Sequence, residues 1–433
     1  MQTLKNAWKI EELRKGFLFT IMILIVYRIG AAIPIPYVEA ASLQAWMQSS
    51  QDVSMFQYFN LLSGDAFSRA TLFALSISPY INSSIIMQLL TIAIPALERL
   101  SQQGEEGRKK IASITRYVTI ALALLTAFGY WTFMRNTQWA DTTTGQLKVG
   151  FLSDRGWFAA IVIIVSYVAG ASIIMWLGEQ INEHGVGNGI SMILFANIVA
   201  SLPAQFMGLF ADKTVGFIVA AIVVVLTLAT MWFVVYISNA ERRIRIQYAK
   251  RQVGRKMYGG QNSFLPLKVN MTGVMPIIFA SAIVSIPSTI AMFVPSFASN
   301  PIYTNWLGQR GWIYMLIFFF LIIAFAYFYV AISFNPVEIA NNLKKNSGTV
   351  PGIRPGKDTS NYITRILNRV TLIGALAVAV IALLPIVLAK FNPSLQSLTF
   401  SGTSVIIVVG VVLEVWREIE AKLSVRHYKG FLD

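Results

Sequence analysis

The chain has 433 residues, of which 55% are hydrophobic and only 13% are charged, and its formal net charge is +15. A soluble domain usually carries about twice that charged fraction, so the composition excludes an ordinary soluble protein. The absence of cysteine excludes disulfides, a thiolate nucleophile and Cys-ligated metals. Several apolar runs exceed the length that crosses a bilayer, which predicts a polytopic membrane protein.

Ten apolar segments follow one another along the chain, and each can cross a bilayer core of roughly 30 Å as a helix. The N-terminal tail is basic and amphipathic and runs directly into the first segment, so no cleavable signal peptide is expected. We expect the helices at residues 16–36, 75–96, 114–134, 156–177, 186–207, 214–237, 272–295, 311–334, 370–389 and 402–422.

The loops between these segments alternate in charge. Most of the 35 Lys and Arg residues lie in the N-terminal tail, in the loops after the second, sixth and eighth segments, and in the C-terminal tail. Positive charge is retained on the cytoplasmic side of a membrane, so both termini are predicted to be cytoplasmic. Arg28 lies inside the first segment, where we expect it either to snorkel or to be paired structurally.

The ten segments divide into two groups of five, and an odd number per group places the two halves in opposite orientation. The expected halves are residues 1–207 and 208–433. Pro79 and Pro276 support this division, because each stands near the start of an equivalent segment, with an aliphatic residue two positions away on either side and a serine five positions on. The alternative is that both prolines only bend their helices.

The apolar segments contain almost no Asp, Glu or His. Ion-coupled transporters usually bury such groups, so a secondary transporter for a small solute is the less favoured hypothesis. The sequence has no HExxH, GxSxG or nucleotide-binding motif, and it predicts no enzymatic activity, no catalytic residue, no metal site and no cofactor. The glycine-rich stretch at 185–189 lacks the Lys-Ser/Thr of a phosphate loop and predicts a tight helix start.

Uncharged polar residues interrupt the second segment at Asn82, Ser84 and Gln88. An unsatisfied polar group in lipid is costly, so these side chains need partners other than lipid. One interpretation is that they join helices permanently. The other is that they make weak hydrogen bonds along a seam that must separate, or line a conduit that must accept many different side chains.

Two cytoplasmic loops, at about 238–270 and 336–369, are unusually long and basic. In the first, "RRIRIQYAKRQ" alternates basic and apolar residues, which predicts a hairpin strand. In the second, "VPGIRPGK" predicts a rigid turn that presents Arg354. The charge alone could serve only to hold the loops inside, but their length and shape favour docking of a large cytosolic partner, for example one with phosphates.

Six stretches spread over nearly the whole chain closely resemble the SecY family, the central channel subunits of the bacterial Sec protein translocase. They are "FNLLSGDAFSRATLFALSISPYINSSIIMQLL" (59–90), "HGVGNGISMILFANIVASLP" (184–203), "RRIRIQYAKRQVGRK" (242–256), "LPLKVNMTGVMPIIFASAI" (265–283), "PGIRPGKDTSNYI" (351–363) and "GTSVIIVVGVVLE" (402–414). The resemblance implies an all-α fold of ten transmembrane helices in two pseudo-symmetric inverted halves around a central pore. It also implies passage of unfolded preproteins across the plasma membrane, and lateral release of apolar segments into lipid.

The resemblance assigns four groups of residues. The aliphatic pore ring, which excludes ions because a narrow apolar constriction dewets, comprises Ile77, Ile81, Ile190, Leu194, Ile278 and Ile407. Leu194 stands where many relatives have isoleucine. The plug lies at about 56–67 and includes Phe59, Leu62, Ser63, Gly64 and Asp65. The lateral gate, between the second and seventh segments, comprises Asn82, Ser84, Ile85, Gln88, Ser281 and Ile286. The residues for motor or ribosome docking are Arg242, Arg243, Lys250, Arg255, Lys256 and Arg354.

The resemblance also implies partners. These are the membrane subunits SecE and SecG, the ATPase SecA, the ribosome, preproteins with their signal sequences, and the lipid bilayer, whereas direct DNA binding is not expected. A bacterial plasma-membrane location follows from the same resemblance. A scaffold or insertase that binds membrane segments without a through-pore is the third hypothesis, and the ring and plug stretches argue against it.

Overall fold

A computed structural model describes residues 8–49, 59–60, 62–140, 147–211, 216–248, 251–253, 256–258, 262–293, 297, 306, 311–391 and 401–429. A helix occupies each of the ten predicted segments. In order, these helices are α2 (Glu11–Gly30), α5 (Ser78–Ala93), α7 (Glu105–Asn136), α8 (Trp157–His184), α9 (Gly189–Ala211), α10 (Gly216–Asn239), α11 (Met275–Val284) followed by α12 (Ile286–Phe293), α14 (Trp312–Ser333), α16 (Lys357–Phe391) and α17 (Ser401–Lys429). In the part of the chain that the structure describes, the shorter helices α3 (Ala40–Ser49), α6 (Pro95–Ser101) and α15 (Pro336–Lys345) lie between them.

Within the described residues, five helical segments are long and apolar enough to cross a membrane by themselves, in α7, α8, α10, α14 and α16. The pair formed by α5 and α6 would make a sixth, although it is bent by 104°. The chain is therefore a multi-pass membrane protein. The count of ten crossings is consistent with these helices and stays a prediction.

The expectation of an all-helical chain holds for the membrane part, but the loops contain strands. β1 (Gln138–Ala140) and β2 (Leu147–Val149) form one hairpin, and β4 (Arg251–Val253) and β5 (Lys256–Tyr258) form another. A third sheet has the strand order β6-β3-β7, with β3 at Glu241–Tyr248, β6 at Asn262–Lys268 and β7 at Gly348–Thr349. Backbone groups of long loops still need hydrogen-bond partners, and short antiparallel ladders provide them.

The predicted strand in the first basic loop is confirmed as β3. Ile244 and Ile246 are buried, whereas Arg243 and Arg245 are exposed, as expected for side chains that alternate across a strand. β3 also pairs with β7 of the second basic loop, with Gln247 opposite Thr349. The two loops are therefore one structural unit with a shared core of Ile244, Ile246, Leu267, Leu343, Val350 and Ile363.

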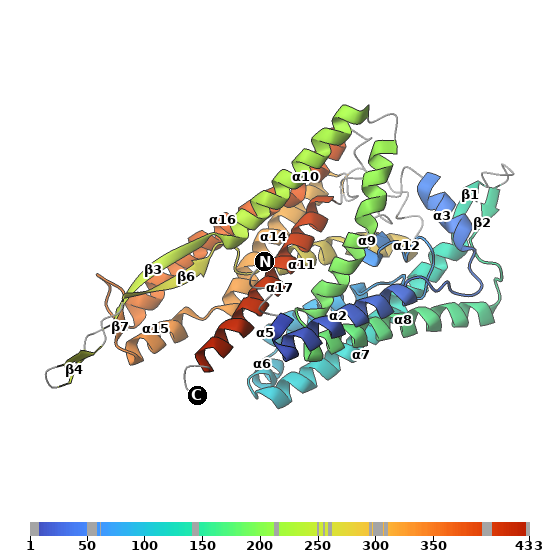
Figure 1. Ribbon diagram of the computed structural model, residues 1–433. Helices are drawn as coiled ribbons and strands as arrows, with labels where there is room; N and C mark the ends of the chain where they lie inside the picture. The colour runs from blue at the N-terminus through green and yellow to red at the C-terminus, as the bar shows by residue number, and fades with distance from the viewer. Residues whose placement is uncertain are drawn as a thin grey trace.

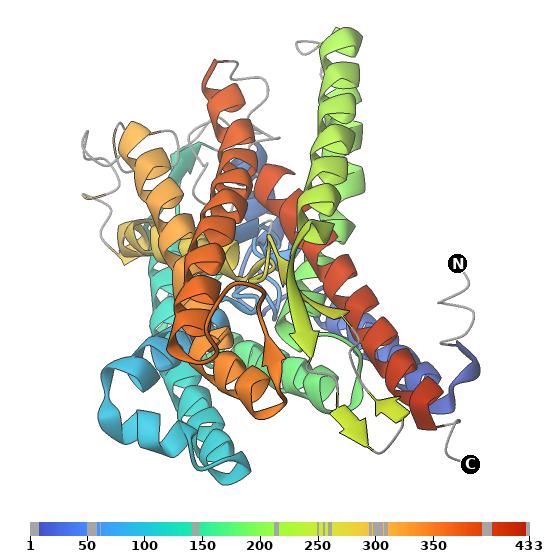
Figure 2. The same cartoon turned by 90° about the vertical axis from the view of Figure 1, so that its left-hand side faces the viewer.

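The two groups of five helices pack in the same order. In the first group α5 packs on α7, α7 on α8 and α8 on α9; in the second, α11 packs on α14, α14 on α16 and α16 on α17. The groups meet where α5 contacts α11, α7 contacts α12, and α9 contacts α17. Figures 1 and 2 show the β6-β3-β7 sheet and α15 together at one end of the second group.

Pro79 and Pro276 begin their helices and do not bend them, so the alternative interpretation of these prolines is wrong. Each stands in the first turn, of α5 and α11 respectively, where a missing backbone N–H costs nothing. Three residues before each proline, the backbone is left-handed, with φ of 53° at Ser76 and 62° at Gly273. The two halves thus repeat a local conformation as well as a packing order.

A second repeated detail lies seven residues before each proline. The carbonyl of Leu72 lies against Gly170 of α8, and the carbonyl of Val269 lies against Gly374 of α16, so closely that a Cβ on either glycine would collide with it. α8 and α16 are the fourth long helices of their halves. The segment that leads into the central helix is therefore seated on an equivalent glycine in both halves.

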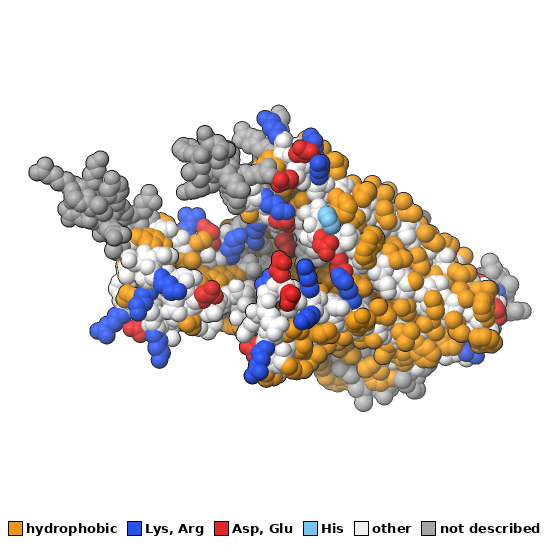
Figure 3. All heavy atoms as spheres, turned by 90° about the horizontal axis from the view of Figure 1, so that it is seen from below, with side chains coloured by type: hydrophobic (Ala, Val, Ile, Leu, Met, Phe, Trp, Pro, Cys, Tyr) orange, Lys and Arg blue, Asp and Glu red, His pale blue; other side chains and the backbone are white. Residues whose placement is uncertain are grey.

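The surface separates into two zones. Charged side chains gather over the end that carries the β6-β3-β7 sheet and the ends of α2 and α17, whereas the adjoining flank is almost entirely hydrophobic (Figure 3). This distribution suits a protein whose flank lies in lipid and whose charged end lies in water.

Candidate functional site

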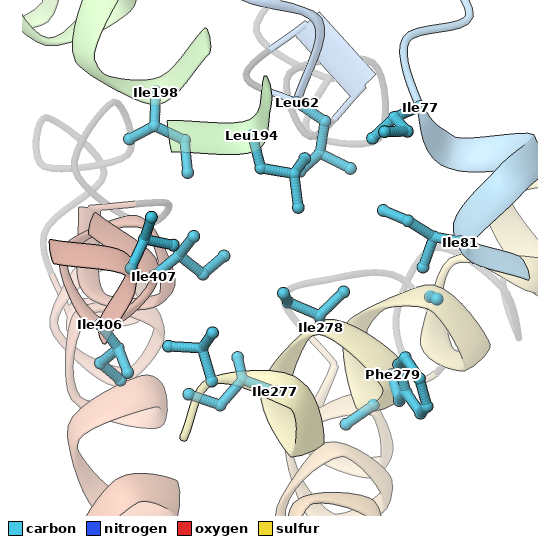
Figure 4. Packing of buried hydrophobic residues seen from close by; sticks show 14 of the residues in the cluster. Leu62, Ile77, Ile81, Leu194, Ile198, Ile277, Ile278, Phe279, Ile406 and Ile407 are labelled. Carbon is cyan, nitrogen blue, oxygen red and sulfur yellow. The ribbon is translucent and has the colours of Figure 1, made fainter. Parts of the chain in front are cut away.

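The six aliphatic side chains of the predicted pore ring come together in one buried cluster. Four of them line a small cavity, and they come from four different helices: Ile81, Leu194, Ile278 and Ile407. Figure 4 shows these four side chains around a common centre. Ile77 is buried in the same cluster, and Ile190 packs against it while partly buried.

The two central helices start at this cluster, which explains how Ile81 and Ile278 reach it. The backbone N–H of Ile81 donates to the carbonyl of Ile77, and that of Ile278 donates to the carbonyl of Val274, so each bond closes a first helical turn. Each isoleucine stands two residues after the proline that begins its helix. Equivalent positions in the two halves therefore supply neighbouring side chains of the ring (Figure 4).

The predicted plug residues that the structure describes lie against the same cavity. Phe59 and Leu62 line it together with the ring. Ser63 is buried; its hydroxyl accepts from the N–H of Phe67 at 2.9 Å and donates to the carbonyl of Asn60 at 3.1 Å. Positions 56–58 and 61 of the predicted plug lie outside the described residues.

Asp65 is held by a neighbour that sequence reasoning missed. The side-chain amide of Asn60 donates to Asp65 Oδ1 at 2.8 Å, and the Asp65 N–H donates to the Asn60 carbonyl at 2.9 Å. The other side-chain atom of Asn60 accepts from the N–H of Ser68. The carboxylate is thus folded back on its own turn, with φ of 69° at Asp65, a conformation that Asp adopts more readily than most residues.

Side chains from outside the plug bond to three of its carbonyl oxygens. Asn197 of α9 and Ser76 each donate to the carbonyl of Leu62, at 2.7 Å in both cases. Tyr130 of α7 donates to the carbonyl of Phe67 at 2.6 Å. Arg28 donates to the Gly64 carbonyl at 3.4 Å, so the expectation of a paired arginine is confirmed. Sequence reasoning missed Asn197, although an amide inside an apolar helix was a visible signal.

The predicted gate residues divide between the cavity and the contact of the two halves. Asn82 and Ser281 line the cavity, and Ile85 is buried in the same cluster as the ring. Gln88 donates to Ser84 at 3.2 Å and accepts from the hydroxyl of Tyr329 at 2.8 Å. Tyr329 belongs to α14, so the seam includes the eighth long helix as well as the seventh.

Ile286 differs from the other predicted gate residues, because 49% of its surface is exposed. It begins α12, where the seventh segment is interrupted. α12 lies against α7, with the ring of Phe293 over Gly129. The seam between the halves therefore continues past Ile286 along α7 and α12.

The basic residues predicted for docking belong to the sheet unit and its neighbouring turns. Arg242 and Arg243 lie exposed on β3, and Lys256 lies in β5. Lys250 and Arg255 lie outside the described residues. Arg354 is exposed in a turn between Gly352 and Gly356, both of which have positive φ, and its carbonyl accepts from Thr359 at 2.8 Å.

Lys268 ends β6 at the base of this unit, where its side chain is partly buried. Partial burial, together with the positive charge of nearby Arg417, lowers the pKa of Lys268.

Among the described residues, no group of three or more His, Asp or Glu side chains could hold a metal ion. The cavity offers an apolar barrier with a few uncharged hydrogen-bonding groups at its side.

The sequence and the fold of this chain both have counterparts among known proteins. The family model for SecY matches residues 71–416. The chain belongs to the SecY family. The "Protein translocase subunit SecY" of Streptomyces galbus is 42% identical to it over 438 residues, which cover 99% of this chain and 98% of that SecY protein. The SecY protein of Corynebacterium glutamicum is 39% identical over the full length of both chains.

Solved structures share the SecY fold at low sequence identity. A structure described as "The structure of a protein conducting channel" superposes with a TM-score of 0.65 at 17% identity, covering 94% of this chain and 92% of that one. "Sec61 in the Canine ribosome-channel complex from the endoplasmic reticulum" superposes with a TM-score of 0.59 at 15% identity, covering 94% and 92%. These likenesses establish the fold.

Proposed function

We propose that this SecY-family chain forms the pore through which unfolded secretory preproteins cross the plasma membrane. The observation that carries the proposal is the convergence of Ile81, Leu194, Ile278 and Ile407 with Phe59 and Leu62 on one cavity between the halves. A narrow aliphatic constriction blocks ions because water leaves it, yet it makes no directional bond that a passing chain must break. Such a ring accepts any sequence.

The polar seam supports lateral release of apolar segments into lipid. Gln88 and Tyr329 join the halves by one uncharged hydrogen bond, and Asn82 and Ser281 lie nearby on the cavity wall. Hydrogen bonds between membrane helices contribute only about 0.6 to 2 kcal/mol each, so an apolar signal helix can displace them. Weak bonds close the gate without locking it.

The chain itself lacks a nucleotide-binding motif, so the energy for transport comes from a partner. We assign docking of SecA or the ribosome to the exposed basic residues of β3 and to the turn at Arg354. Two of the similar solved structures are described as ribosome-bound complexes, which supports the ribosome as one partner of this fold. SecE and SecG complete the proposed complex in the bacterial plasma membrane, with both termini of this chain cytoplasmic.

The test uses the natural absence of cysteine. Single cysteines are placed at Ile81, Ile278 and Ile407, and at Leu316, which is 57% exposed on α14 and serves as a lipid-facing control. A secretory precursor that carries its own cysteine is then stalled during ATP-driven transport and disulfide crosslinks are measured. Crosslinks at all three ring positions and none at Leu316 are expected. Crosslinks at the gate side alone would indicate an insertase, and none during active transport would refute the pore.

A further inference from the structure

We infer that Ser76 and Asn197 form a latch that holds the plug in its closed position through one backbone atom, the carbonyl oxygen of Leu62. Both side chains donate to this oxygen at 2.7 Å. Ser76 precedes α5, and Asn197 lies on α9, one turn past the ring residue Leu194. The inference rests on the proposed function, because it assigns these two residues the positioning of the plug.

The backbone conformation of Ser76 is unfavourable for serine, which suggests that the hydrogen bond of its side chain compensates for this cost. Ser76 has φ of 53°, a left-handed conformation that is unfavourable for residues with a Cβ. Gly273 occupies the equivalent position of the second half, three residues before Pro276, with φ of 62°. Glycine adopts this conformation without strain, so the first half accepts a backbone cost that the second half avoids. What the serine adds is its hydrogen bond to Leu62.

Asn197 is held in place from three sides. It is fully buried, and its amide nitrogen also donates to the hydroxyl of Tyr27 at 2.8 Å. Its side-chain oxygen is buried and finds no hydrogen-bond partner within the part of the chain that the structure describes. Gly64 lies beside this oxygen, since a Cβ at Gly64 would stand 3.0 Å from it. Asn197 is therefore hydrogen-bonded to the plug through its amide nitrogen, whereas its amide oxygen lies against the plug without a hydrogen bond.

The unpartnered oxygen makes the latch releasable. A buried acceptor without a donor destabilises the closed state, and this cost offsets part of what the donated bonds contribute. When Leu62 leaves, the cavity admits water, and water can satisfy Asn197 and Ser76 together. The closed plug is thereby held firmly enough to seal and weakly enough to be displaced by an arriving chain.

The experiment measures plug release directly and needs no precursor. Ser63→Cys places a thiol of similar size at a fully buried plug position in the cysteine-free chain. Its labelling by a membrane-impermeant maleimide, in the assembled complex, then reports how often the plug leaves. Asn197→Ala and Ser76→Gly should each raise the labelling rate roughly threefold to tenfold, the effect of one lost hydrogen bond.

The Ser76→Gly variant distinguishes a specific effect on plug release from a general loss of folding stability. Glycine relieves the strained backbone, so the unfolding temperature should stay the same or rise while labelling becomes faster. Matched controls are Gly273→Ser, which puts a serine at the equivalent position of the second half, and Ser191→Ala, which removes another buried hydroxyl from α9. Both controls should label at the parental rate.

The double variant decides whether the two residues act together. In the double variant, the Leu62 carbonyl accepts from neither side chain. The labelling rate, relative to the parent, should therefore increase by more than the product of the increases in the two single variants. A rate equal to that product, or parental labelling in a well-folded Ser76→Gly variant, would overturn the latch. These results do not depend on crosslinks to a precursor, so failure of the latch and failure of the pore proposal are told apart.

Discussion

The hydroxyl of Tyr329 donates a hydrogen bond of 2.8 Å to the side-chain oxygen of Gln88, 241 positions away in the sequence. The bond joins α14 of the second half to α5 of the first. The amide of Gln88 in turn donates to Ser84 at 3.2 Å. This short chain of uncharged groups crosses the contact between the halves and accounts for two of the polar residues inside α5, Ser84 and Gln88.

Removal of this bond should favour the open gate. Tyr329→Phe or Gln88→Leu is expected to shift the open–closed balance by about 1 kcal/mol, the size of one membrane hydrogen bond. Asn82→Leu should act in the same direction. Export of a precursor with a defective signal sequence measures the shift. The matched control is Tyr327→Phe, whose hydroxyl donates to Asn368 within the second half; equal export by the two phenylalanine variants would contradict a gating role.

Gly64→Ala should loosen the plug. Gly64 has φ of 61°, and a Cβ there would lie 2.7 Å from Arg28 Nη1 and 3.0 Å from the Asn197 oxygen. Gly273→Ala is the control, because its φ is 62° and no described atom lies within 4 Å of its Cβ. The left-handed conformation should cost both variants about 1–2 kcal/mol of folding stability. Only Gly64→Ala should increase ion conductance of the resting channel, and equal conductance would show that the plug tolerates the methyl group.

Substitution of two adjacent isoleucines should distinguish a residue that seals the pore from one that only packs in the core. Ile278 lines the cavity, whereas Ile277 is fully buried and does not line it. Ile277→Ala should lower the free energy of unfolding by about 2–5 kcal/mol, as expected for a buried aliphatic truncation. Ile278→Ala should cost less stability but widen the constriction and raise ion leak. Thermal unfolding and single-channel conductance, measured on both variants, check this; the reverse pattern would remove Ile278 from the ring.

The turn that carries Arg354 should matter for transport and not for folding. Arg354→Ala is expected to abolish motor-driven transport of a soluble precursor, because its side chain is exposed and available to a partner. Thr359→Val should reduce transport partially, since the Thr359 hydroxyl holds the Arg354 carbonyl. Lys345→Ala, an exposed cation at the end of α15, controls for loss of general charge. Transport by Arg354→Ala at the rate of Lys345→Ala would refute the docking assignment.

Local patterns in the sequence predicted the elements well but not their ends. Apolarity marks the part of a helix that lies in lipid, whereas backbone hydrogen bonding continues into water. α7 therefore begins at Glu105 and not at 114, and α16 begins at Lys357 and not at 370. α5 begins at Ser78, later than the predicted 75, because the left-handed Ser76 interrupts the helix. Alternation in the first basic loop correctly predicted β3, since strand periodicity is local.

Contacts between segments that are distant in the sequence could not be predicted from such local patterns. The ring residues came from family resemblance, because each would otherwise pass for an ordinary core aliphatic. The bond between Gln88 and Tyr329, the pairing of Gln247 with Thr349, and the hold of Asn197 on Leu62 all depend on how helices pack. No periodicity specifies such pairs. The repeated Pro79 and Pro276 did indicate equivalent helices, although their effect was to start the helices and not to bend them.

The pairing of β3 with β7 has a mechanical consequence. The sheet follows directly on α10, β7 contacts α15, and β6 contacts α16. These three helices belong to the second half. A large partner that binds this sheet is therefore attached to only one of the two halves. We expect a force that this partner applies to act on the second half through α10 and α16. The second half would then move relative to the first half, which contains Gln88 and Leu62. If a partner docks at either basic loop, as we propose, its force would act on the contact between the two halves.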